Sequence, residues 1–181
     1  MYIPERGYHQ KFGLNKLGSF NTLHFMDKRL NKIRIGFSKG WKDISKENPN
    51  GPPTFINYEI EDSGVLQIST AEFIGGQKPN PNFSDLINLS KNIGLKNEFG
   101  IVRHEESGNC GYGKYGFVEF SRSDFPYIAV WHLSDGKNFI IATFICATQP
   151  NPKQIGDVRN ILTSIRKSSF FGSFFQWFRK D

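Results

Sequence analysis

The chain has 181 residues, a formal net charge of +6 and an aromatic content of 15%. This length predicts one domain with a substantial core, and no stretch approaches the roughly 18 apolar residues of a membrane-spanning helix. The first residues lack the apolar segment of a secretory signal. Cys110 and Cys146 have neither metal-ligand spacing nor the pattern of a disulfide framework. We therefore expect a cytoplasmic protein without a metal or a cofactor.

The positive charge is concentrated near the N-terminus. Residues 1–46 carry ten Lys and Arg against three Asp and Glu, whereas residues 47–181 have a net charge of −1. Such asymmetry is typical of a segment that meets an anionic partner. A solvated basic face gives the same pattern, so both interpretations stay open.

Alternating or continuous apolar runs predict the strands. In chain order they are residues 21–26, 32–37, 54–61, 65–73, 98–106, 114–122, 127–133 and 139–147. Gly40-Trp41, residues 47–53 and residues 107–113 are expected to be turns or loops. Asp135-Gly136 between the last two strands predicts a tight β-hairpin.

A unit of strand, Gln, Pro-Asn-Pro and helical pattern occurs twice, in residues 65–94 and 138–166. In the second unit Asn151 suits the N-cap and Pro152 the first helical position. Gln154 follows the cap by three residues, as in a capping box. The sequence therefore predicts two helices, each of which is entered from a strand by the same kind of turn.

In the first unit, Asn80 and Pro81 are expected to open the helix and Gly94 to end it. Arg166 and Lys167 are expected to end the second helix, where cations complement the helix dipole. Residues predicted to be buried in the common core are Trp131, Ile141, Phe144, Val158, Ile161 and Ile165.

Consecutive hairpins predict an antiparallel sheet of about six or seven strands. Residues 127–133 and 139–147 are apolar enough to be central strands buried on both faces, so the helices are expected to cover the sheet. The predicted fold class is α+β, a three-layer α/β/α sandwich. We divide the chain into a basic N-terminal segment (1–29), this domain (30–166) and an aromatic C-terminal tail (167–181).

Three features of the domain resemble the PsbP-like fold, which photosystem II subunits share with the Ran-binding Mog proteins. They are IRIGFSKGW at residues 33–41, a first helix that follows a hairpin, and VWHLSDGKNFIIATFICATQPNPKQIGDVRNILTSIR at residues 130–166. The resemblance covers roughly residues 30–166 and implies the same fold. Bacterial members include immunity proteins that neutralise toxins. No residues match a metal-related or Ran-binding function, so neither is carried over.

One motif resembles a kinase phosphate loop. Residues 111–118 match G-x-G-x-x-G-x-V, but the other kinase motifs are absent and the glycines lead into a strand. A glycine-rich hairpin is therefore expected. The adjacent Glu105 and Glu106 point to opposite faces of a strand, so they are not expected to act as a carboxylate pair.

A thiol site is the enzymatic hypothesis. Cys110 would be the nucleophile and His104 or His132 the base, with His104 and Cys110 facing each other across a turn. The alternative is that Cys110 is an ordinary turn residue. Cys146 lies in an apolar strand and is expected to be inert core.

The C-terminal tail is the main candidate binding element. Its candidate partner-binding residues are Phe171, Phe174, Phe175, Trp177 and Phe178. Aromatic residues of this kind anchor protein partners, and an aromatic segment closed by cations also suits a membrane interface. Packing on its own domain is the third possibility.

The absence of a catalytic constellation favours a non-enzymatic protein-binding domain, specifically a bacterial immunity-type protein that masks a toxin. A basic N-terminal quarter argues against a nuclease as that toxin, because nuclease inhibitors tend to be acidic. The alternatives are a peripheral protein that binds a membrane or another anionic surface and an enzyme with an unfamiliar site around Cys110. No specific nucleic-acid partner is expected, since no binding module is present.

Overall fold

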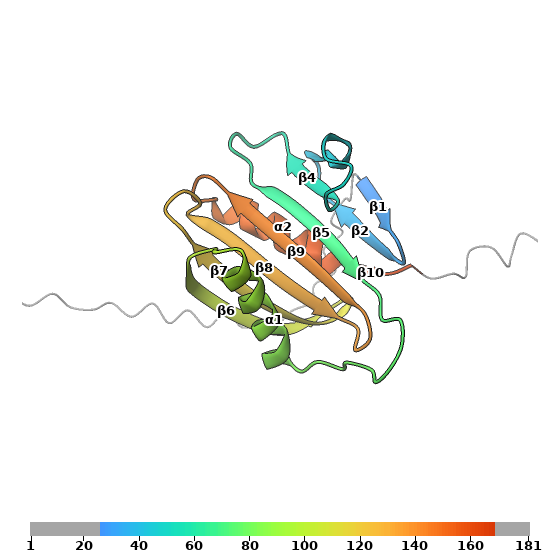
Figure 1. Cartoon of the computed structure of the whole chain (residues 1–181). Coiled ribbons are helices and arrows are strands. Elements are labelled where there is room, and N and C mark those ends of the chain that lie inside the picture. The colour runs from blue at the N-terminus through green and yellow to red at the C-terminus, as the bar shows by residue number, and fades with distance from the viewer. Residues whose placement is uncertain (1–25, 169–181) are drawn as a thin grey trace, which may run out of the picture.

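The structure is a computed structural model that describes residues 26–168. Its elements in chain order are β1 (Met26–Leu30), β2 (Ile33–Phe37), β3 (Trp41–Asp43), the 3-10 turn η1 (Ser45–Glu47), β4 (Thr54–Asn57), β5 (Val65–Ala71), α1 (Phe83–Lys96), β6 (Ile101–Cys110), β7 (Gly113–Ser121), β8 (Tyr127–Ser134), β9 (Phe139–Cys146), α2 (Pro152–Ser164) and β10 (Arg166–Lys167). Figure 1 shows their arrangement.

A seven-stranded antiparallel sheet forms the centre of the molecule. Its strand order is β3-β4-β5-β9-β8-β7-β6, and a smaller sheet has the order β1-β2-β10. All eight residues of β8 are buried, as expected of a central strand covered on both faces. The predicted α+β class and the size of the antiparallel sheet are therefore confirmed.

The hairpin between β8 and β9 follows from its turn residues. Gly136 has a φ of 87°, a left-handed conformation that glycine adopts without strain. The Asp135 carboxylate accepts hydrogen bonds from the backbone N–H groups of Lys137 (2.9 Å) and Asn138 (2.7 Å). The predicted Asp-Gly hairpin is confirmed, with Ser134 opposite Phe139.

Helix α1 begins later than predicted. The N-cap is Asn82, whose side chain forms a reciprocal capping box with Asp85, so Asn80 and Pro81 belong to the preceding loop. Gly94 lies inside the helix and does not end it, because the helix continues to Lys96. Gly94 is needed for packing: a Cβ at this position would overlap the ring of Phe120 on the sheet.

Helix α2 begins as predicted, with Asn151 as N-cap accepting from the backbone N–H of Gln154 (2.9 Å) and Pro152 in the first turn. The Gln154 side chain is buried and does not complete a capping box. The prediction for Arg166 and Lys167 was wrong. Ser164 ends the helix, and these two residues form β10, which pairs with β2.

Each face of the large sheet carries one helix (Figure 1). Helix α1 packs on β6, β7 and β8, where it covers a small cluster that includes Val118, Phe120 and Val130. A Cβ at Gly116 would overlap the backbone of α1, so this glycine permits the close approach. The four buried residues of β7 and β8 that face α1 form a core separate from the one beneath α2.

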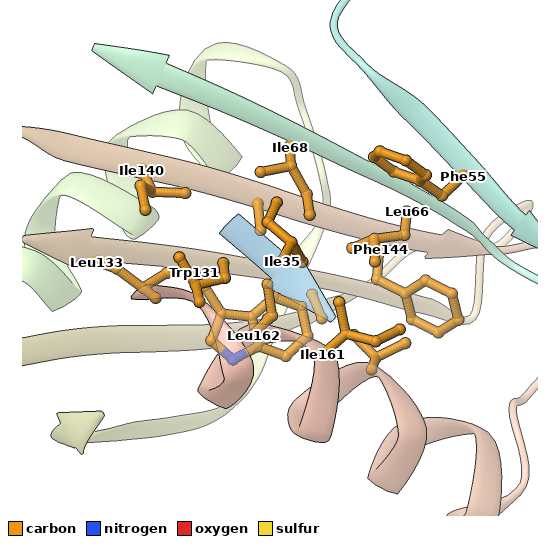
Figure 2. Packing of buried hydrophobic residues seen from close by; sticks show 14 of the residues in the cluster. Ile35, Phe55, Leu66, Ile68, Trp131, Leu133, Ile140, Phe144, Ile161 and Leu162 are labelled. Atoms are coloured by element: carbon orange, nitrogen blue, oxygen red, sulfur yellow. The ribbon is translucent and has the colours of Figure 1, made fainter. Parts of the chain in front are cut away.

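The larger core lies on the other face, where α2 and the small sheet cover the large sheet. Figure 2 shows Ile161 and Leu162 of α2 packed beside Ile35 of the small sheet and Trp131 of β8. Five of the six residues predicted to be buried are buried: Trp131, Phe144, Val158, Ile161 and Ile165. Ile141 is half-buried because it lies on the other face of β9, opposite His132, where α1 gives incomplete cover.

Other boundaries differ from the predictions. Trp41 is the first residue of β3 and not part of a turn, and the strand predicted for residues 54–61 ends at Asn57. Residues 107–110 continue β6, so the predicted glycine-rich turn of residues 107–113 is far shorter. Strand β1 was not predicted, because MDKRL lacks a clear apolar alternation. All but the last residue of the strand predicted at 21–26 lies outside the described residues.

Candidate functional site

Strand β6 forms one edge of the large sheet. It is ten residues long, and its side chains are mostly exposed, including Ile101 (57%) and Val102 (44%). A β-bulge at Arg103 interrupts its pairing with β7. An edge strand presents unpaired backbone groups on its outer side, and bulges and charges are the usual protection. Beyond the bulge, residues 104–110 pair regularly with β7.

A cleft lies beside this edge, between α2 and the β6–β7 hairpin. It is open to solvent, and its cavity volume is about 50 Å³. Its lining residues are Cys110, Tyr115, Trp131, Leu133, Arg159, Leu162 and Thr163. The lining therefore combines a largely apolar floor with Arg, Tyr and Trp, the residue types that carry most binding energy in protein interfaces.

A polar network joins α2 to β6 and β7 next to the cleft. Arg159 donates to both carboxylate oxygens of Glu106, at 3.0 and 3.2 Å, and Tyr115 donates its hydroxyl hydrogen to the same carboxylate. The Arg159 guanidinium also lies 5.0 Å from the ring centroid of Phe117. Arg159 and Tyr115 are thereby held in fixed positions along the cleft.

The network alters the ionisation of its members. Burial opposes ionisation of Glu106, but the Tyr115 hydrogen bond and the charge of Arg159 outweigh it, so the pKa of Glu106 lies below its usual value. Burial and the bond to Glu106 raise the pKa of Tyr115. Both groups therefore keep their neutral-pH charge states, with Tyr115 as hydrogen-bond donor and Glu106 as acceptor.

Sequence reasoning placed the two glutamates correctly on opposite faces. Glu105 pairs with Lys91 of α1 at 2.7 Å, whereas Glu106 pairs with Arg159 of α2. It missed the network itself, because Arg159 and Glu106 are 53 positions apart. The one local signal is the alternation of residues 114–120, which places Tyr115 and Phe117 on the same face of a strand.

The structure does not assemble the proposed thiol site. His104 and Cys110 do not face each other across a turn, because both belong to β6. Six strand residues span about 20 Å, far beyond the reach of a hydrogen bond. His132 lies on the opposite face of the sheet, where its Nδ1 is 2.9 Å from Oγ of Ser90 in α1. The hairpin expected for residues 111–118 is confirmed.

Two buried groups have strongly altered pKa values. Burial lowers the pKa of His132 to about 4, so this imidazole is neutral at pH 7. Burial raises the pKa of Cys146 to about 12, which agrees with its predicted place in the core. Cys110 is half-buried at the wall of the cleft.

Several candidate residues lie outside the part of the chain that the structure describes. These are the tail residues Phe171, Phe174, Phe175, Trp177 and Phe178. Within residues 26–168 there is no group of three or more His, Cys, Asp and Glu that could hold a metal ion. None of the helices in this part of the chain is long and apolar enough to cross a membrane.

The comparisons with known proteins support the fold. No family model and no curated protein matches the chain. Its structure is similar to the solution structure of cyanobacterial PsbP (CyanoP) from Synechocystis sp. PCC 6803, with a TM-score of 0.52 and 10% identity, over 85% of this chain and 98% of that one. The fold is therefore PsbP-like.

A crystal structure from Bacteroides thetaiotaomicron matches less well. Its TM-score is 0.45 at 13% identity, and the match covers 76% of this chain and 46% of that one. Neither of these two structures is described as a Mog-type or immunity protein. The likeness to the cyanobacterial protein extends to the fold and not to a function.

Proposed function

We propose that this chain is a non-enzymatic protein-binding domain whose contact site is β6 with the cleft beside it. The observation that carries the proposal is the combination of a ten-residue exposed edge strand with an adjoining cleft that has an apolar floor. A strand of this length offers a row of backbone donors and acceptors to a second chain. The cleft adds a place for side chains.

The supported mode of binding is strand addition. An extended segment that pairs with β6 directs every second side chain to the same face, and on the α2 face that position lies beside the cleft. Main-chain hydrogen bonds supply affinity, and the side-chain site supplies selectivity. Trp131, Leu133 and Leu162 favour an apolar side chain in the cleft.

The bulge limits where the partner pairs. Regular pairing is disturbed between Val102 and His104, so the partner strand is proposed to occupy Glu105–Cys110. Ser107 and Asn109 are exposed there and leave room for a neighbouring chain. Gly108 is covered on one side by the Tyr115 ring, which a Cβ would approach within 3.0 Å.

No catalytic role is proposed for Cys110. The two histidines that would activate it lie about 20 Å away along β6 and on the opposite face of the sheet. The cysteine contributes a wall of the cleft.

The specific version of the proposal is a bacterial, cytoplasmic immunity-type protein that masks a toxin. It rests on the sequence resemblance, since bacterial proteins of this fold include such inhibitors. The proposed binding domain is residues 30–166, a three-layer α/β/α sandwich in which the small sheet shares the layer of α2. The tail residues after Lys167 are proposed to add aromatic contacts to the same partner.

Two substitutions on α2, each of which introduces an arginine, test the site. Thr163 lines the cleft, whereas Asn160 is exposed on the same helix and does not line it. Thr163→Arg fills the mouth of the cleft and is expected to lower capture of a copurifying partner at least tenfold, about 1.4 kcal/mol. Asn160→Arg makes the same change of charge and is expected to leave capture unchanged.

The outcome that counts against the proposal is a monodisperse protein that brings down no partner at native abundance. Equal loss of capture in Thr163→Arg and Asn160→Arg would show that charge on α2, and not the cleft, controls the interaction.

A further inference from the structure

One end of the molecule, the turn end, gathers the β1–β2 turn, the β5–α1 loop, the β8–β9 turn and β10. Three contacts hold it together: Asn31 to Thr70 (2.6 Å), Lys32 to Glu72 (2.6 Å) and Lys167 to Asp135 (2.8 Å). It lies at the lower right of the sheet in Figure 1. This end is distinct from the outer side of β6.

The β5–α1 loop extends from the turn end and is anchored there by two hydrogen bonds. The backbone N–H of Phe73 donates to Oδ1 of Asn138 (3.1 Å), and that of Asn80 donates to the carbonyl of Gly136 (3.0 Å). Between these anchors the loop is exposed, and Ile74 is 99% exposed. A large apolar side chain is thus presented to the surroundings by a loop that is tied at both ends.

Three lysines surround this loop. Lys137 lies 5.8 Å from the ring centroid of Phe73. Lys114 is half-buried, donates to the carbonyl of Pro81 (3.3 Å) and lies 5.8 Å from the ring centroid of Phe83. Lys78 is within the loop itself and exposed. In residues 26–168 none of the three forms an ion pair with a carboxylate.

The nearby carboxylates do not neutralise these lysines. Glu72 is paired with Lys32 and Asp135 with Lys167. Asp85 accepts from the backbone N–H of Asn82 in the capping box of α1. Three lysines against the single carboxylate of Asp85, which has no ion pair within residues 26–168, leave a net positive charge around an exposed apolar tip.

We propose that the turn end docks on an anionic membrane surface. Ile74 would enter the interface between headgroups and acyl chains, with the adjacent Phe73, while the lysines contact headgroup phosphates. An apolar group ringed by cations is the pattern of interfacial binding. An acidic protein would use the lysines but gives no reason for a fully exposed isoleucine.

The last described residue of the chain lies at the same end of the molecule. Ser168 follows β10 at the turn end, where its N–H donates to the carbonyl of Lys32 (2.7 Å). The sequence continues from there into residues 169–181, which hold six aromatic residues followed by Arg179 and Lys180. Stable attachment to a membrane requires two weak signals together, and the exposed apolar tip and the lysines of the turn end supply one each without residues 169–181.

Vesicle co-sedimentation of the full-length protein tests the proposal. Vesicles of phosphatidylcholine with phosphatidylglycerol are compared with phosphatidylcholine alone. Each lysine at an anionic surface adds about fivefold to binding, so the combined variant K78A, K114A and K137A is expected to bind about a hundredfold more weakly. The control variant K42A, K96A and K153A loses the same charge at the opposite end of the sheet and is expected to bind as the parent does.

Ile74→Ser tests the apolar contact and is expected to weaken vesicle binding while leaving the binding of soluble polyglutamate unchanged. If Lys114→Ala lowers the thermal midpoint, the variant K78A and K137A replaces the triple variant, with an expected loss of about thirtyfold.

Three results would overturn the proposal. The first is equal binding to vesicles with and without phosphatidylglycerol. The second is an equal loss in the turn-end and control variants, and the third is unchanged vesicle binding in Ile74→Ser, which would mark a general polyanion site. Variants of the cleft beside β6 are expected to bind vesicles normally, so failure here is separable from failure of the protein-binding proposal.

Discussion

The buried His132 predicts a pH-dependent stability that can be measured in isolation. Its side chain is 4% exposed, and its pKa is about 4 in the folded protein, against about 6.5 in an unfolded chain. Between these values the unfolded state binds more protons, so stability rises with pH across the window. The contribution is complete above pH 6.5 and is lost as the pH falls towards 4.

The size of the effect follows from the two pKa values. The difference corresponds to about 3 kcal/mol of unfolding free energy between pH 7 and pH 4. The carboxylates of Asp43 and Asp135 have pKa values of about 2. The stability that these carboxylates contribute is complete above about pH 3.9, their pKa in an unfolded chain, and declines below it. This decline lies below the range of about pH 4 to 6.5 in which His132 acts.

Urea denaturation at a series of pH values between 4 and 7 measures this slope. His132→Gln is expected to remove most of it, while His104→Gln, at an exposed position of β6, is expected to retain it. The reasoning is refuted if the unfolding free energy of the His132→Gln variant declines with falling pH as steeply as that of the parent.

Four further changes test the packing and the network. Ile161→Ala is expected to lower the unfolding free energy, measured by urea denaturation, by about 2–5 kcal/mol. Deletion of residues 170–181 is expected to lower it much less. An equal loss in the two variants would assign the tail to the core. Gly94→Ala is expected to lower the thermal midpoint because the new Cβ overlaps the Phe120 ring, although this change normally stabilises a helix by up to about 1 kcal/mol; a raised midpoint would contradict the packing. Glu106→Gln is expected to weaken the decline of stability at acid pH, because the pKa of this carboxyl is lowered in the fold; an unchanged acid profile would argue against the network.

Much of the fold could be predicted because local chemistry determines it. The Asp135-Gly136 turn fixes one hairpin, and Asn151 with Pro152 fixes the start of α2. The start of α1 was misplaced because two Asn residues precede the helix, and the capping partner Asp85 distinguishes Asn82 from Asn80. Turn residues therefore indicate that a helix begins nearby, but they do not decide which of two closely spaced Asn residues is the N-cap.

The candidate site could not be predicted from local patterns. Glycines at 108 and 111 suggested a long turn, but Gly108 lies in β6 beneath the Tyr115 ring. The bond from Arg159 to Glu106 depends on how α2 lies across the sheet, which no short motif records. The turn end likewise needs the tertiary fold, since Lys78 and Lys137 meet there from distant parts of the chain.

Amide hydrogen exchange of β6, with and without the captured partner, tests the central claim most directly. Strand addition predicts that amides in residues 105–110 exchange more slowly in the complex, while those of β3 at the other edge of the sheet are unchanged. Exchange in β6 that is the same in the free and bound protein, with protection elsewhere, would contradict the account.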